Sequence, residues 1–105
     1  MDKKDALNIA RQYASLVTTN YDCKKIFLFG SYVRGTFHDE SDIDIAVILK
    51  EFENPLDIQL GLMRLRRKID SRIEPHPFRE KDFTSTNPIV HEILKHGERI
   101  DTSIV

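Results

Sequence analysis

The segment from Asp42 to Lys50 constrains the fold more than any other part of the chain. It begins with carboxylates that alternate with aliphatic residues and then becomes continuously apolar. Because alternate side chains of a strand point to opposite sides, its residues divide between two faces. One face holds Ile43, Ile45, Val47 and Leu49, and the other holds Asp42, Asp44, Ala46 and Ile48. The pattern predicts a central strand that is covered on both faces and polar only where it begins.

The first part of the chain predicts a helix, a strand and a short helical turn. Apolar residues at helical spacing indicate an amphipathic helix over residues 5–20, which Asp5 or Asp2 would cap. Residues 25–29 form a short apolar run that stops at Gly30, as a buried strand does. Residues 31–34 fit one helical turn, and the polar residues 36–41 fit a loop.

Two Asn-Pro pairs mark helix starts in the second part, because Asn caps a helix and Pro suits its first position. Helices are therefore expected after Asn54 and Asn87, the second ending at Gly97. Between them, residues 71–74 suggest a strand that Pro75 and Pro77 would end, and residues 99–100 suggest a short edge strand. The order predicts an α/β (α+β) fold, a small mixed sheet with helices packed on it, as a single domain over residues 1–105.

Composition excludes several classes of protein. The 105 residues are 40% hydrophobic and 31% charged, which are ordinary globular values, and the net charge is −1. No basic stripe is present, which argues against nucleic acid as the main partner. Cys23 is the only cysteine, so an internal disulfide and a cysteine-built zinc site are excluded. Neither a signal peptide nor a membrane-spanning apolar run is evident, and a cytoplasmic protein is the expectation.

Asp42 and Asp44 are the first candidates for chemistry. Two carboxylates two residues apart on a strand lie on the same face and can share a cation. Magnesium prefers hard oxygen ligands and keeps positions open for water or phosphate. An isolated Asp-x-Asp pair would equally fit a solvated strand start, so the interpretation depends on what surrounds it.

Gly30 and Ser31 supply that context. A buried strand that ends in Gly, followed by Ser and a helical turn, presents backbone N–H groups and a hydroxyl to an anion. Glycine also lets the backbone approach a ligand closely. A Gly-Ser turn separated by a ten-residue spacer from an Asp-x-Asp strand is much rarer than either alone, and it indicates a metal–triphosphate site.

The motifs over residues 30–36 and 41–47 resemble the signature of the DNA polymerase β-like nucleotidyltransferase superfamily. More narrowly, the chain resembles the minimal nucleotidyltransferases (MNT), including the MntA-type antitoxins. The resemblance covers almost the whole chain. It implies that the Gly-Ser turn binds the triphosphate of ATP and that the two aspartates bind two Mg²⁺ ions. It also implies a third carboxylate on a neighbouring strand.

Glu74 is the best match to that third carboxylate, because it would face Asp42 and Asp44 if Ile73 faces the core. Many members of the family have Asp there, and an exposed strand carboxylate is the competing interpretation. Asp70 is the second choice, at a helix end. The metal and catalytic set is therefore Asp42, Asp44 and Glu74.

Two further residues are candidates for binding the nucleotide. A guanidinium at Arg34 could bind phosphate with two hydrogen bonds, or it could support the loop. Ser41 precedes the aspartates and could contact the nucleotide, although it fits a loop-shaping role better. The nucleotide-binding set is therefore Gly30, Ser31, Arg34 and Ser41.

Other polar and aromatic residues are given structural interpretations. The histidines share no metal-ligand spacing, and His76 is expected in a loop, although it could approach the site. The basic run over residues 64–68 fits a solvated helix face. Four phenylalanines could form a partner surface or pack under loops: Phe37, Phe52, Phe78 and Phe83.

The resemblance also implies an acceptor. Minimal nucleotidyltransferases are often antitoxins paired with a helical HEPN-domain toxin, and some transfer AMP to a tyrosine of that partner. A magnesium-dependent protein adenylyltransferase is therefore the leading hypothesis. A catalytically weak module that neutralises its partner by contact is the alternative. Nucleotidyl transfer to a small molecule is a third, less favoured for want of a substrate-binding domain. Homo- and hetero-oligomers both remain open.

Overall fold

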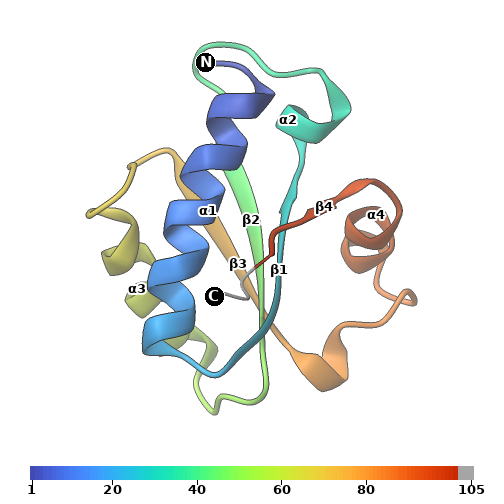
Figure 1. Cartoon of the computed structure of the whole chain (residues 1–105). Coiled ribbons are helices and arrows are strands. Elements are labelled where there is room, and N and C mark those ends of the chain that lie inside the picture. The colour runs from blue at the N-terminus through green and yellow to red at the C-terminus, as the bar shows by residue number, and fades with distance from the viewer. Residues whose placement is uncertain (102–105) are drawn as a thin grey trace.

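A four-stranded mixed sheet organises the computed structural model, which describes residues 1–101 (Figure 1). The elements in chain order are α1 (Lys3–Asn20), β1 (Cys23–Phe29), α2 (Ser31–Arg34), β2 (Ile43–Leu49), α3 (Pro55–Arg66), β3 (Ile73–Arg79), the 3₁₀ helix η1 (Glu80–Asp82), α4 (Pro88–His96) and β4 (Glu98–Arg99). The strand order is β3-β2-β1-β4. β2 pairs antiparallel with β1 and parallel with β3, so the expected central strand and mixed sheet are confirmed.

The helix ends follow from local side-chain chemistry. Asp2 caps α1, and its carboxylate accepts a hydrogen bond from the Asp5 backbone N–H. The Asp5 carboxylate in turn accepts from the Asp2 backbone N–H. Asn54 and Asn87 cap α3 and α4, each with Pro at the first helical position. Gly35 ends α2 with φ of 78°, a left-handed conformation that favours glycine. These starts and stops agree with the sequence expectation.

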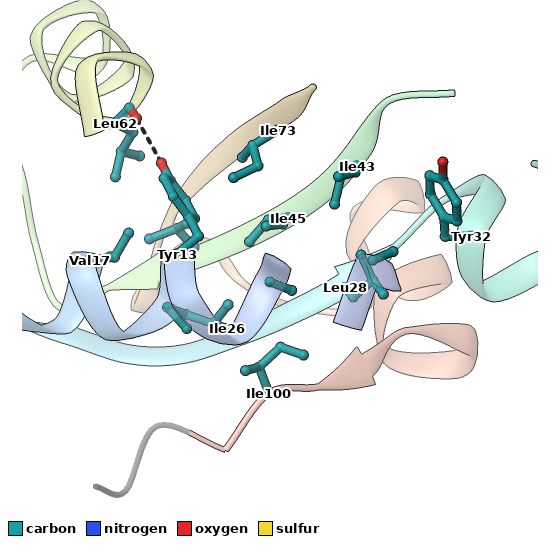
Figure 2. Packing of buried hydrophobic residues seen from close by; sticks show 14 of the residues in the cluster. Tyr13, Val17, Ile26, Leu28, Tyr32, Ile43, Ile45, Leu62, Ile73 and Ile100 are labelled. Atoms are coloured by element: carbon teal, nitrogen blue, oxygen red, sulfur yellow. Dashed lines mark hydrogen bonds between the residues drawn. The ribbon is translucent and has the colours of Figure 1, made fainter. Parts of the chain in front are cut away.

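The larger core lies on one face of the sheet, under α1 and α3 (Figure 2). The inward side chains of β2 pack there against the apolar stripe of α1, which includes Tyr13 and Val17. The Tyr13 hydroxyl donates to the Leu62 carbonyl at 2.8 Å and joins α1 to α3. Burial raises the pKa of this phenol, so it remains a hydrogen-bond donor.

A smaller cluster lies on the opposite face, which α4 covers in part. Ala46 and Ile48 of β2 meet Phe27 of β1 and Ile93 of α4 in this cluster. The division of β2 into two faces is therefore as the alternation predicts. The polar beginning of β2 is not fully covered, since Asp42 is exposed and Asp44 is partly exposed.

β3 corrects one expectation: the strand does not end at Pro75 but continues to Arg79. Proline cannot donate to a neighbouring strand, but β3 is an edge strand with only β2 beside it. On its open side the Ile73 carbonyl accepts from Arg66 at 2.9 Å, and the Pro75 carbonyl accepts from Gln59 at 3.0 Å. Side chains of α3 thus satisfy the open edge, and the prolines remove no ladder hydrogen bond there.

The four phenylalanines considered either for a partner surface or for packing under loops all have contacts within the fold. The Phe37 ring stacks on buried Tyr32 at 4.8 Å, and the Arg79 guanidinium lies over the Phe52 ring at 4.4 Å. Phe78 and Phe83 belong to the smaller cluster. Within residues 1–101, no helix has both the length and the apolar character to cross a bilayer.

Candidate functional site

Asp44 is the centre of the candidate site because neighbours on both strands converge on it. The β-sheet register pairs it with Phe29 at the end of β1 and with Glu74 near the start of β3. Its side chain is half-buried, on the face opposite α1. Asp44 therefore lies where the ends of three strands meet, next to the turn that begins at Gly30.

The Gly30–Ser31 turn lies directly against the Asp44 carboxylate. Gly30 has φ of 81° and ψ of −150°, a conformation essentially restricted to glycine. A Cβ at this position would overlap Oδ2 of Asp44. The Gly30 carbonyl accepts from the backbone N–H groups of Val33 and Arg34 at 3.2 and 3.1 Å, which fixes α2 behind the turn. The absence of a side chain is what allows turn and carboxylate to approach.

Asp42 and Glu74 lie on the same side of the sheet as Asp44. Asp42 is exposed and comes directly before β2, while Glu74 is the register partner of Asp44. Ile73 is fully buried in the larger core, which turns Glu74 to the other face, as the sequence suggested. Across residues 1–101, no three Asp, Glu, His or Cys side chains form a closed metal-ligand group. The metal roles of these carboxylates stay predictions.

His76 lies in a different element from the one that the sequence predicted. It lies on β3 rather than in a loop, and its Nε2 is 3.0 Å from Oδ1 of Asp44. Its ring meets the Phe29 ring edge-on, with centroids 5.0 Å apart. His76 is therefore part of the site, and the two oxygens of Asp44 face different neighbours.

A hollow of about 190 Å³ opens beside these residues, between the sheet, α2 and α4. Its lining includes Gly30, Arg34, Asp44 and His76, with two residues of α4, Ile89 and Glu92. Arg34 is exposed, and its Nη1 lies 2.7 Å from Oε1 of Glu92. The guanidinium proposed for phosphate thus faces the hollow while it is paired with a carboxylate of α4.

Two other candidates have structural partners. The Ser41 hydroxyl, which is largely buried, accepts from the His38 backbone N–H at 2.8 Å and closes the loop before β2. Asp70 accepts from the Arg72 backbone and guanidinium at 2.7–3.0 Å, and the side-chain hydrogen bond from Arg72 lowers the pKa of Asp70. Asp70 is thus committed to Arg72, whereas Glu74 lies beside Asp44.

The sequence did not identify Glu92 or Ile89 as site residues. Both lie on α4, more than fifty residues after the Gly-Ser turn, and the Arg34–Glu92 contact spans 58 positions. The helical spacing of α4 indicates its apolar stripe, but not which strand or turn its other face meets. For His76, alternation with Glu74 was the available signal, provided that the strand was extended through both prolines.

Comparisons with known proteins bear on the family and the fold of this chain. The family model described as polymerase beta, nucleotidyltransferase matches residues 11–102. The provisionally named protein adenylyltransferase MJ0141 of Methanocaldococcus jannaschii is 26% identical over 101 residues, which cover 91% of this chain and 99% of that protein. A second protein of that organism, provisionally named protein adenylyltransferase MJ1379, is 45% identical over 47 residues, 45% of this chain and 47% of the other.

Solved structures share the fold. A crystal structure from Sulfolobus solfataricus, provisionally described as a nucleotidyltransferase, matches with a TM-score of 0.67 and 21% identity, covering 92% of this chain and 80% of that one. A chain from the complex of tri-AMPylated Shewanella oneidensis HEPN toxin with MNT antitoxin matches with a TM-score of 0.60 and 17% identity, covering 96% and 73%. A chain of a toxin–antitoxin crystal structure with AMP-PNP matches with a TM-score of 0.64 and 22% identity, covering 91% and 74%.

Proposed function

Because the chain belongs to the polymerase β nucleotidyltransferase family and resembles its minimal members, we propose that it transfers AMP from ATP to a hydroxyl group of a HEPN-domain partner protein. The observation that carries the proposal is the contact of the Gly30 turn with the Asp44 carboxylate. This contact supports the proposal because a Gly-Ser turn suits phosphate, a carboxylate oxygen suits a metal ion, and a metal–triphosphate complex needs the two side by side.

The proposed metal site consists of Asp42, Asp44 and Glu74. All three supply hard oxygen ligands from one side of the sheet, and Glu74 is in register with Asp44. Bound Mg²⁺, two ions in this proposal, would neutralise phosphate charge and acidify the acceptor hydroxyl. The close fit of Gly30 against Asp44 supports the assignment, because it brings this carboxylate next to the turn proposed for the phosphates.

The proposed nucleotide site consists of Gly30, Ser31, Arg34 and Ser41. Backbone N–H groups and the Ser31 hydroxyl suit the β- and γ-phosphates, and the Arg34 guanidinium faces the same hollow. Ser41 acts on the site through the loop that it closes before Asp42. Together these groups would orient the α-phosphate for in-line attack, so positioning supplies much of the rate.

The proposed transfer forms one bond and breaks one. The acceptor oxygen bonds to the α-phosphorus, the bond from that phosphorus to the bridging oxygen breaks, and pyrophosphate leaves. Glu74 accepts the proton of the acceptor hydroxyl, a role that its position beside Asp44 supports. The names of similar proteins support the choice of a protein partner. Two relatives are provisionally named protein adenylyltransferases, and one solved chain with this fold comes from a complex of HEPN toxin with MNT antitoxin.

A second candidate is a module that neutralises its partner by contact with little catalysis. Two observations favour it: the carboxylates of residues 1–101 form no closed metal-ligand group, and Arg34 is paired with Glu92. No observation among the described residues favours transfer to a small molecule.

The test is to incubate the purified chain with Mg²⁺, α-labelled ATP and the HEPN-domain protein co-expressed with it. Label on the partner that disappears in Asp42→Ala and Asp44→Ala, and persists in the exposed loop variant Asp39→Ala, supports the enzyme. Unlabelled partner that is nonetheless neutralised by all three variants supports the contact module. Competition by unlabelled ATP but not by GTP would show that the site prefers adenine as the base of the nucleotide.

A further inference from the structure

We propose that His76 is a positioning residue that holds the Asp44 carboxylate in the orientation that the nucleotide site uses. This inference rests on the proposed function, since it assigns His76 a role at the same metal–triphosphate site. It goes beyond the aspartate motif, because the residue comes from β3 and acts through Asp44.

The two oxygens of Asp44 have different neighbours. Oδ1 lies 3.0 Å from Nε2 of His76, and with a proton on that nitrogen the imidazole donates to the carboxylate. Oδ2 lies against Gly30, where even a Cβ would overlap it. The hydrogen bond from His76 therefore fixes the rotation of the carboxylate, with one oxygen on the imidazole and the other directed at the Gly30–Ser31 turn.

His76 is itself well fixed. Its backbone pairs in register with Ala46 of β2, and Pro75 and Pro77 on either side restrict the strand through their fixed φ angles. Its ring meets Phe29 of β1 with centroids 5.0 Å apart, so the imidazole extends across β2. The short side chain of Ala46, between the two strands on this face, leaves the ring space to do so. A donor held on a strand and against a second ring can orient a carboxylate reproducibly.

Removal of the donor would free the carboxylate to turn about its own side-chain bonds. Hydrogen bonds to a metal-ligating group orient it, and their loss typically weakens metal binding by about 10–100-fold. A purely packing role for the imidazole predicts something else: any change of ring shape would matter, whether or not a donor remained. Substitutions that separate shape from hydrogen bonding therefore test the proposal.

The experiment measures binding of Mn²⁺ in the presence of AMP-PNP, by electron paramagnetic resonance of the free ion, together with thermal unfolding. His76→Leu removes the donor, whereas His76→Gln retains an amide N–H at a similar reach. His91→Leu, at an exposed position of α4, is the matched control. We expect the Kd for Mn²⁺ to rise about 10–100-fold in His76→Leu, to return close to the wild-type value in His76→Gln, and to be unchanged in His91→Leu.

Three outcomes would overturn the proposal, and they can be told apart. Wild-type affinity in folded His76→Leu would show that Asp44 needs no support from His76. Equal weakening in the Leu and Gln variants would assign the effect to packing. No binding of Mn²⁺ and AMP-PNP by the wild-type chain would reject the proposed function itself, and the inference with it.

Discussion

Gly30 and Asp44 are matched in space: the carboxylate Oδ2 occupies the position that a Cβ at residue 30 would need. The glycine is also required by its backbone, with φ of 81° and ψ of −150°. The turn proposed to bind phosphate and the strand proposed to bind metal are therefore coupled by close contact, although one follows the end of β1 and the other is the beginning of β2. A substitution at either residue should affect the other.

Gly30→Ala should therefore abolish nucleotide binding and destabilise the fold. The Gly-only conformation would cost roughly 1–3 kcal/mol in the free energy of unfolding, and the methyl group would displace the Asp44 carboxylate. Urea unfolding and binding of a fluorescent ATP analogue measure the two effects.

Gly35→Ala is the matched control for this prediction. Gly35 also has a positive φ, 78°, but no atom lies within 4 Å of its added Cβ. It should lose roughly 1–2 kcal/mol of stability to backbone strain and still bind the analogue. If Gly30→Ala binds the analogue as well as Gly35→Ala does, the contact with Asp44 has no role in binding.

The ion pair between Arg34 and Glu92 should oppose nucleotide binding. To meet a phosphate, the guanidinium must exchange the Glu92 carboxylate at 2.7 Å for the ligand. Since the pair is about half exposed, its loss should change the binding free energy by no more than about 1 kcal/mol. Glu92→Gln should then lower the Kd for AMP-PNP up to about fivefold, as measured by calorimetry, and Arg34→Ala should raise it.

The control is Glu98→Gln, which breaks the exposed pair with Lys3 at 2.9 Å, away from the hollow. Its Kd should equal that of the wild type. A gain in affinity in both variants would indicate a general effect of net charge, whereas no gain in Glu92→Gln would mean that Arg34 does not meet the phosphates.

Cys23 should react slowly with thiol reagents. Burial raises the pKa of its thiol from near 9 to about 11, so at pH 8 its thiolate fraction is about a hundredfold smaller than usual. A raised pKa means that the folded state favours the protonated thiol. This contribution to stability is complete below about pH 9 and is lost as the pH rises through about 11. Reaction with a chromogenic disulfide at pH 8 should be much slower in the native chain than in urea, and equal rates would contradict the burial.

Local chemistry made much of this fold predictable. The Asn-Pro starts, the glycine stops and the alternation along β2 are each decided within a few residues, and all agree with the structure. The predicted end of β3 was wrong because a proline ends an interior strand but is tolerated in an edge strand. Whether Pro75 lies at an edge depends on the sheet order β3-β2-β1-β4, which no short segment determines.

The candidate site also combines features that are local in the sequence with contacts between distant residues. The Gly-Ser turn and Asp-x-Asp could be recognised because both the chemistry and the spacing are local. Glu92 could not be recognised, and His76 was named only as a residue that could approach the site, because their contacts with Arg34 and Asp44 span 58 and 32 positions. Parallel register and the placement of α4 decide those contacts. The carboxylate motif could therefore be recognised from the sequence, whereas the contact of His76 with Asp44 and the pairing of Glu92 with Arg34 could not.

Asp70 should stabilise the fold at neutral pH and lose that effect in acid. Its carboxylate accepts from the Arg72 guanidinium and backbone at 2.7–3.0 Å, and the side-chain hydrogen bond lowers its pKa. A lowered pKa in the folded state adds stability above the unfolded value of about 3.9, and that stability is lost as the pH falls through the folded pKa. The Arg72 carbonyl in turn accepts from the Ile43 N–H at 2.9 Å, so this turn sets the start of the register that places Glu74 beside Asp44.

Asp70→Asn should therefore lower the free energy of unfolding at pH 7 by about 1.5–3 kcal/mol, the usual range for a hydrogen bond to a charged group. The difference from wild type should begin to shrink as the pH falls below about 4, and it should vanish below the lowered folded pKa of Asp70, where both chains lack the charge. Asp22→Asn, which loses an exposed pair with Lys24, should change stability far less at either pH. Urea unfolding at pH 7 and pH 3 measures the difference in unfolding free energy between each of the two variants and the wild type. A difference for Asp70→Asn that stays constant between the two pH values would mean that the carboxylate charge does not hold this turn.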